Sequence, residues 1–88
     1  MNRKPIKSVS KKDDFFNKAA KEIDSTYFPN VKYYGDSIET TKIHRILVLF
    51  NNGLIAFTGM VTRIAQICNV ETEEIYTILE KYVNITYR

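Results

Sequence analysis

The sequence predicts a mainly α-helical domain with a small β component, built from about four helices and short strands. Three observations lead to this fold class. Apolar residues recur with the period of one helical face in several separate segments. Asparagine or glycine follows these segments at positions where helices commonly end. A short apolar run, Leu54–Phe57, separates two of the helical patterns and favours a strand. With 88 residues, 44% of them apolar, the chain can build one modest core.

The chain divides into a basic flexible arm, residues 1–10, and a single domain, residues 11–88. Residues 1–12 contain five basic side chains and no acidic one, whereas residues 13–88 hold eight basic and ten acidic side chains. The formal charge of +3 therefore hides a strongly basic arm on a slightly acidic domain. Such an arm either binds a polyanion or serves as a solvated tail, and both interpretations stay open.

A first helix is predicted from about residue 11 to about residue 25. Ser10 or Asp13 can cap its start, and Pro29 prevents it from continuing. Its apolar face consists of Phe15, Phe16, Ala19, Ala20 and Ile23. The segment 27–35 that follows is rich in aromatic residues and is predicted to be a loop or short strand. Its rings form either a stacking or dimer surface or a lid over the core, and we favour the lid.

A second helix is predicted to start at Asp36 and Glu39, which resemble a capping box. Its apolar face consists of Ile43, Ile46, Leu47 and Phe50. The Asn-Asn-Gly run that follows ends the helix, because Gly53 suits the left-handed cap. The same region can also be drawn as two strands, 45–50 and 54–58, joined by a hairpin turn. We favour the helix because the cap and the apolar spacing agree.

Two further helices are predicted, one from Thr58, which can cap it, to about Cys68 and one from about Thr72 to about Val83. Asn69 lies where the chain must turn between them. The last residues, 84–88, favour β structure and are predicted to return as an edge strand beside Leu54–Phe57.

The residue types of an enzyme or metal site are missing from the sequence pattern. Cys68 stands alone and is predicted to be a small buried apolar side chain. His44, between Lys42 and Arg45, is predicted on the polar side of its helix without a carboxylate or nucleophile arranged for catalysis. We therefore expect a non-enzymatic protein without a cofactor. No apolar run approaches the length of a membrane span, which predicts a cytoplasmic protein with no membrane contact.

The order of helix, Asn-Gly stop, short strand, helix, turn and helix over residues 37–83 resembles the winged-helix branch of the helix-turn-helix families. The residues that carry this resemblance are Ile43–Gly53, the Thr62-Arg-Ile-Ala-Gln helix start, Asn69-Val70 at the turn, and Ile75, Tyr76 and Leu79 in the last helix. Those families usually have glycine in place of Asn69 and serine or threonine in place of Glu71. Only five residues follow Val83, so any wing has to come from segment 27–35 or from a partner subunit.

The resemblance implies that the chain binds double-stranded DNA, as a small dimeric regulator or accessory factor of a phage or plasmid. The expected contacts to phosphates or the minor groove come from Arg3, Lys4, Lys7, Lys11 and Lys12 of the arm and its junction. The other expected contacts are Lys42, Arg45 and Arg63 to the backbone, and Thr72, Glu73, Tyr76 and Thr77 to the major groove. A homodimer is expected because the core of so short a chain is small.

The last helix also supports a different class of partner. Four glutamates, Glu71, Glu73, Glu74 and Glu80, lie on it or beside it, and carboxylates repel phosphate. Glu73 and Glu74 are predicted to lie off the buried face of this helix. The alternative function is an adapter that contacts a basic protein, such as a polymerase subunit or a larger replication or transfer protein. A contiguous basic surface would support DNA as the partner, and an acidic surface would support a protein.

Overall fold

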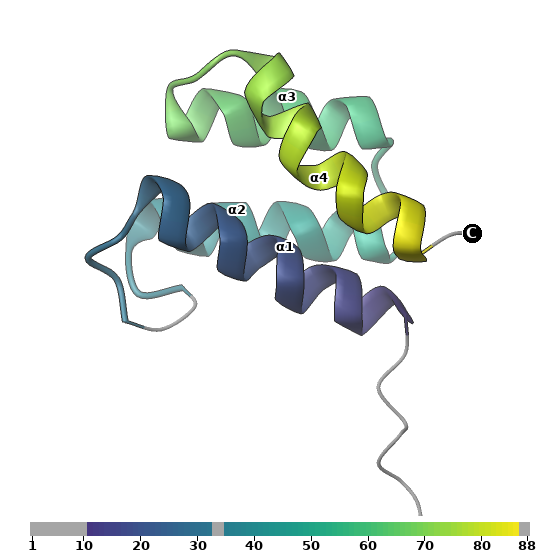
Figure 1. Cartoon of the computed structure of the whole chain (residues 1–88), viewed down its shortest axis with the longest axis horizontal. Helices are drawn as coiled ribbons and strands as arrows, with labels where there is room; N and C mark the ends of the chain where they lie inside the picture. Colours follow the sequence, from purple (N-terminus) through teal and green to yellow (C-terminus); the bar gives the residue numbers. More distant parts are fainter. Residues whose placement is uncertain (1–10, 33–34, 87–88) are drawn as a thin grey trace, which may run out of the picture.

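The structure, a computed structural model, describes residues 11–32 and 35–86, and the side chains of residues 15–32 and 35–83. This part of the chain contains the helices α1 (Lys11–Tyr27), α2 (Ile38–Asn51), α3 (Phe57–Cys68) and α4 (Thr72–Thr86) (Figure 1). The predicted mainly α fold is confirmed. The small β component is not found, since the described residues include no strand. None of their helices combines the length and apolar character needed to cross a membrane.

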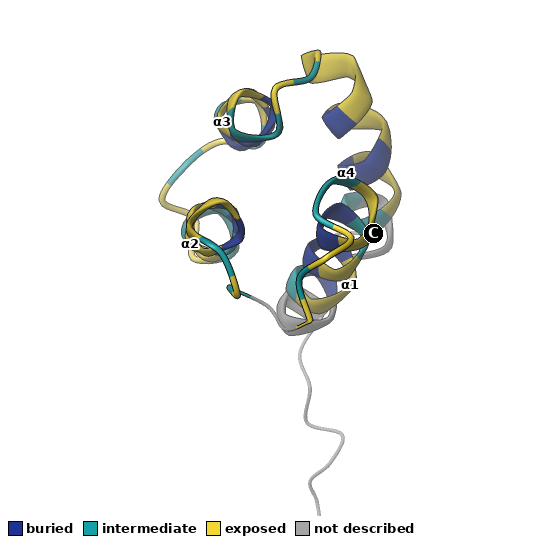
Figure 2. Ribbon diagram, turned by 90° about the vertical axis from the view of Figure 1, so that its left-hand side faces the viewer, coloured by how far each residue is buried: buried dark blue, intermediate teal, exposed yellow. Residues whose placement is uncertain are grey.

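The helices form two layers. α1 packs mainly on α2 and α4, and α3 packs mainly on the same two helices. Figure 2 shows α2 and α3 on one side and α1 and α4 on the other, with the buried parts of the helices turned toward the space between them. The core filling this space takes residues from all four helices. Its buried members are Phe15, Ala19, Ala20, Ile23, Ile43, Leu47, Met60, Val61, Ile64, Ala65, Ile75, Ile78 and Leu79.

α1 buries the face that the sequence predicts, and Phe16 lies half-buried at its edge. The helix ends at Tyr27, where the Phe28 amide still donates to the Asp24 carbonyl over 2.8 Å. Tyr27 and Phe28 pack against the core, as expected for a lid rather than a stacking surface. The other two aromatic residues of this segment, at positions 33 and 34, lie outside the described residues, as does the cap candidate Ser10.

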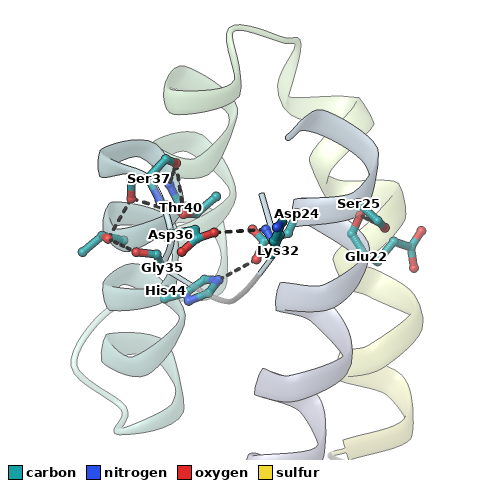
Figure 3. Close-up of polar contacts among 10 residues, drawn as sticks. Glu22, Asp24, Ser25, Lys32, Gly35, Asp36, Ser37, Thr40 and His44 are labelled. Carbon is teal, nitrogen blue, oxygen red and sulfur yellow. Dashed lines mark hydrogen bonds and ion pairs between the residues drawn. The ribbon is translucent and has the colours of Figure 1, made fainter. Parts of the chain in front are cut away.

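The predicted cap of α2 is wrong by one residue. Ser37, not Asp36, is the N-cap, and it forms a reciprocal capping box with Thr40. The Thr40 amide donates to the Ser37 hydroxyl over 3.1 Å, and the Ser37 amide donates to the Thr40 hydroxyl over 2.9 Å (Figure 3). The Asp36 carboxylate instead accepts a hydrogen bond from the Lys32 amide over 3.1 Å, which connects the two ends of the preceding loop. Thr40 is fully buried, so its short side chain suits this place better than glutamate does.

The helix chosen for residues 45–50 is confirmed, and the hairpin alternative is wrong. α2 ends in a left-handed turn at Gly53, whose φ is +75°. The Gly53 amide donates to the Phe50 carbonyl and the Leu54 amide to the Leu49 carbonyl, each over 2.9 Å, as in a Schellman motif. The strand predicted at 54–57 is therefore wrong, because residues 54–56 form a turn and residue 57 begins α3.

Two expectations for the last two helices also need correction. Thr58 does not cap α3, since Ala56 holds the N-cap position without a side-chain hydrogen bond and Thr58 is the second helical residue. α4 continues to Thr86, so the edge strand predicted at 84–88 is wrong over residues 84–86. With no strand at 54–57 to pair with, further helix lets these residues form their backbone hydrogen bonds within the segment.

Candidate interaction groove between α3 and α4

A groove of about 390 Å³ lies between the first halves of α3 and α4. It is lined by Thr58, Val61, Thr62, Thr72, Glu73, Tyr76 and Thr77. The four residues of α4 that the sequence marks for partner contact, Thr72, Glu73, Tyr76 and Thr77, are all in this set. The structure therefore brings this predicted group together. It adds three residues of α3 that sequence reasoning missed: Thr58, Val61 and Thr62.

The turn between the two helices fixes this arrangement. Asn69 adopts the left-handed conformation, with φ 62° and ψ 47°, directly after α3. The Val70 amide donates to the Ala65 carbonyl over 3.0 Å, which closes the end of α3 and sends the chain back across it. In α4, Ile75, Ile78 and Leu79 are buried. The opposite side of that helix is thus free to line the groove.

Tyr76 is held at the groove by a continuous series of aromatic contacts. Its ring meets Phe57 edge-on, with centroids 5.4 Å apart. Phe57 contacts Phe50 at 5.9 Å, and Phe50 contacts Phe15 at 5.5 Å, so one residue from each helix takes part. Tyr76 is nevertheless 44% exposed. Packing on one edge and exposure elsewhere leave part of this ring available to a partner.

Two of the hydroxyl groups in the groove can act only as acceptors in this arrangement. The Thr62 hydroxyl donates to the Thr58 carbonyl over 3.0 Å, and the Thr77 hydroxyl donates to the Glu73 carbonyl over 2.9 Å. Because their protons are used within the helices, these two oxygens offer lone pairs to a ligand. No hydrogen bond or ion pair joins the Glu73 carboxylate to another described residue. That carboxylate is an acceptor when ionised.

The charged group in the groove lining is a carboxylate, and the helix that carries it has further exposed carboxylates. Glu73 is the one charged residue among the described side chains that line it. Glu71, Glu74 and Glu80 are exposed on the adjoining turn and on α4. The one lysine of α4 within the described side chains, Lys81, pairs with Glu22 of α1 at 3.1 Å and is not aimed at the groove lining.

Glu74 differs from Glu73 because it takes part in holding α4 against α1. Both side chains are exposed, as the sequence predicts. The Tyr27 hydroxyl, however, donates to the Glu74 carboxylate over 2.7 Å. Tyr82 of α4 likewise donates its hydroxyl to Glu22 of α1. Sequence reasoning missed both contacts because they join residues far apart in the chain.

The predicted basic residues are not gathered at this groove. Lys42 and Arg45 line a separate hollow of about 420 Å³ at the start of α2, and Arg63 is exposed on α3 outside the groove lining. Arg3, Lys4 and Lys7 lie outside the described residues, as do the side chains of Lys11 and Lys12. The described residues thus give the groove no basic wall.

His44 has a partner that sequence reasoning missed. Its Nε2 lies 3.0 Å from Oδ2 of Asp24, and the pair connects α2 to α1 (Figure 3). The sequence pattern did not indicate this pairing, which links two helices. Asp24 could have been found from its spacing, since it follows Ala20 by four residues on the buried face of α1. Burial raises the pKa of the Asp24 carboxyl, opposed by the hydrogen bond with His44.

Cys68 lies half-buried on α3 as a free thiol. Burial, followed by the nearby Asp24 and Glu74 carboxylates, raises the pKa of its thiol to about 11. A thiol with so high a pKa is a poor nucleophile at neutral pH. The described residues also contain no cluster of histidine, cysteine or carboxylate side chains that could hold a metal ion.

Comparisons with protein-family models, with curated proteins and with solved structures give no match for this chain.

Proposed function

We propose that the protein is a non-enzymatic interaction module that binds a positively charged partner protein in the groove between α3 and α4. One observation carries this proposal: the groove is lined by hydroxyl groups, one aromatic ring and a single charge, which is negative. Glu71 precedes α4 and is exposed, so a second carboxylate lies beside the start of the helix that carries Glu73. A basic protein segment would be attracted by this field, whereas phosphate would be repelled.

Nucleic-acid-processing proteins, which commonly present basic surfaces, are the partner class to test first, including polymerase subunits and replication or transfer proteins. The adapter would then act by occupying a basic segment of such a protein. The polar rim and the exposed aromatic residue suit a contact of modest affinity that forms and dissociates readily.

A selection of displayed peptides against the whole protein tests this function. The selection is run in parallel on the wild type and on Thr62→Trp, in which a large side chain fills the groove. Thr62 is exposed, so the fold should tolerate the change. Lys42→Trp is the matched control, because it places the same ring at an exposed site outside the groove. Peptides that bind wild type and Lys42→Trp but not Thr62→Trp are the expected result. Peptides that bind the wild type and both variants equally well would contradict the proposal.

DNA binding is the second candidate function, and the helix-turn-helix order of α3 and α4 favours it. A three-residue turn joins the helices, and Thr72, Tyr76 and Thr77 are exposed on the first half of the second helix. Proteins that read DNA with this motif place that half in the major groove. In this case the basic arm would supply most of the affinity.

The salt dependence of duplex binding tests this candidate. Removing Met1–Val9 deletes Arg3, Lys4 and Lys7. The slope of log affinity against log salt should then fall by about one for each phosphate contact that is lost. An arm of the same length with these three residues changed to serine separates the charge from the length. An unchanged slope would exclude the arm as the DNA-binding element, and sedimentation of both forms reports whether the protein is a dimer.

A further inference from the structure

We propose that the groove between α3 and α4 recognises an arginine side chain of its partner, with Glu73 binding the guanidinium and Tyr76 packing against its flat face. This inference rests on the proposed function, because it names the chemical group that the groove takes from a protein partner.

The first step of the argument is the direction of the hydrogen bonds. Thr62 and Thr77 have donated their hydroxyl protons to carbonyls of their own helices, over 3.0 and 2.9 Å. Their oxygens can therefore only accept from a ligand in this arrangement, and the Glu73 carboxylate accepts as well. These acceptors suit a ligand that is rich in donors, and guanidinium has five N–H donors and no acceptor. The hydroxyls of Thr58, Thr72 and Tyr76 also line the groove and can donate or accept, so the charge of the ligand is decided by Glu73.

The second step is the charge. Glu73 lines the groove, and no hydrogen bond or ion pair joins its carboxylate to another described residue. Its neighbour Glu74 is already engaged by the Tyr27 hydroxyl at 2.7 Å. Glu73 is therefore the carboxylate available to a cation from outside, and a planar guanidinium can meet it with two parallel hydrogen bonds.

The third step distinguishes arginine from lysine. Tyr76 is supported by the edge-on contact with Phe57 at 5.4 Å and remains 44% exposed. A guanidinium stacks on an aromatic face while it binds a carboxylate in its own plane, which an ammonium cannot do. Val61, which also lines the groove, offers an apolar wall for the methylene stem of the side chain.

Short peptides test the inference directly on the full chain. The probes are acetyl-Gly-Arg-Gly-amide and its lysine and citrulline counterparts, titrated into isotopically labelled protein and followed through the backbone amide resonances. Citrulline keeps the shape of arginine without its charge. The arginine peptide should shift the amides of Thr58, Thr62 and Thr77 with a dissociation constant on the order of millimolar. Citrulline should bind about tenfold more weakly, and lysine should lie between them.

Variants with a matched control assign the contacts. Glu73→Gln should weaken the arginine peptide by about fivefold, which corresponds to the loss of one exposed charge contact. Glu80→Gln removes the same charge from the same helix, about 10 Å further along its axis, and should leave binding unchanged. Tyr76→Phe should retain binding and Tyr76→Leu should lose it, because the ring and not the hydroxyl makes the contact. Dispersed amide spectra verify that each variant is folded.

Three results would overturn the inference. Equal affinities of the arginine and citrulline peptides would show that the charge of the guanidinium does not contribute to binding. Equal losses of affinity in Glu73→Gln and Glu80→Gln would indicate only a general attraction of the peptide to the negative charge of α4. A DNA duplex that shifts the same amides and displaces the arginine peptide would assign the groove to nucleic acid. The proposed function has a separate test. Displayed peptides that bind the groove but contain no arginine would contradict the arginine inference and still support a protein-binding groove. If no displayed peptide binds the groove, both proposals are contradicted.

Discussion

The imidazole of His44 and the carboxylate of Asp24 meet at 3.0 Å between α2 and α1, in a place where Asp24 is only 6% exposed. The second oxygen of this carboxylate, Oδ1, is buried and has no hydrogen-bond partner among the described residues. Phe16 covers one side of the imidazole, with ring centroids 5.7 Å apart. The interaction is thus well shielded from water. A buried charge of this kind is costly as soon as its partner is removed.

Replacing His44 with alanine should therefore lower the free energy of unfolding by about 3 kcal/mol, because Asp24 is left buried without its partner. Changing both residues to leucine should cost less than the single change, since no unpaired polar group remains. Urea denaturation measures both values. Lys42→Ala, an exposed change on the same helix, serves as the control. If His44→Ala lowers the free energy of unfolding no more than Lys42→Ala does, the pair of His44 and Asp24 does not stabilise the fold.

The pKa shifts of Asp24 and Glu22 predict opposite effects of pH on stability. Burial raises the pKa of Asp24 above 3.8, so the folded state binds this proton more tightly and stability falls as pH rises from 3.8 to the raised value. Burial alone would raise the pKa of Glu22. The hydrogen bonds from Tyr82 and Lys81 outweigh this effect, so the pKa of Glu22 lies below 4.5. The stabilisation that ionised Glu22 gives to the folded state is present above pH 4.5, and it is lost as the pH falls through the lowered pKa of this carboxyl.

Unfolding free energies measured from about pH 3 to pH 7 separate the two groups. In Asp24→Asn, the part of the stability that the wild type loses as the pH rises should no longer be lost. In Glu22→Gln, the part that the wild type loses as the pH falls should no longer be lost. Identical pH profiles for the two variants would contradict the assignment.

The left-handed residue between α3 and α4 predicts a test of the turn. Asn69 has a φ of 62°, which a side chain with a β-carbon adopts only at some cost. Asn69→Ala should therefore destabilise the protein by about 1 kcal/mol. Asn69→Gly should match or exceed the wild type, because glycine adopts this conformation freely. Thermal unfolding of the two variants makes the comparison, and equal losses from both would point to a role of the amide side chain instead.

Glu73 and Glu74 should behave differently when each is changed to glutamine. Glu74 accepts the Tyr27 hydroxyl over 2.7 Å, so Glu74→Gln should cost about 1 kcal/mol of stability. Glu73 makes no such contact, and Glu73→Gln should leave stability within about 0.5 kcal/mol of wild type. Tyr27→Phe should remove the effect of the Glu74 change. Additive losses in the double variant would show that the two side chains do not interact.

The positions of the helices were predictable because each one repeats its apolar residues with the helical period and ends at a recognisable residue, such as Gly53 or Asn69. The cap at Ser37 was missed by one residue because hydroxyl and carboxylate side chains both suit this role. The strand at 54–57 was wrong because a short apolar run does not distinguish a strand from a turn whose side chains reach the core.

The wall of the candidate site that α4 provides was predictable from the position of Thr72, Glu73, Tyr76 and Thr77 after the turn. The wall from α3 was not, because it depends on how the two helices cross. The pairing of His44 with Asp24 and of Tyr27 with Glu74 joins residues 20 and 47 positions apart. Spacing along α1 can place Asp24 on the buried face, but it does not say which residue of another helix that side chain meets. The packing of the whole domain determines these partners.

The packing of α1 against α4 also bears on how the chain folds while it is being synthesised. α1 leaves the ribosome before α4 and is held by it, through contacts such as Tyr82 to Glu22 that span 60 positions. Until α4 emerges, the apolar side of α1 that contains Phe15 and Ile23 lacks part of its cover. This domain therefore stays incompletely folded until α4 has been synthesised, and we expect the nascent chain to need protection from aggregation until that helix is free.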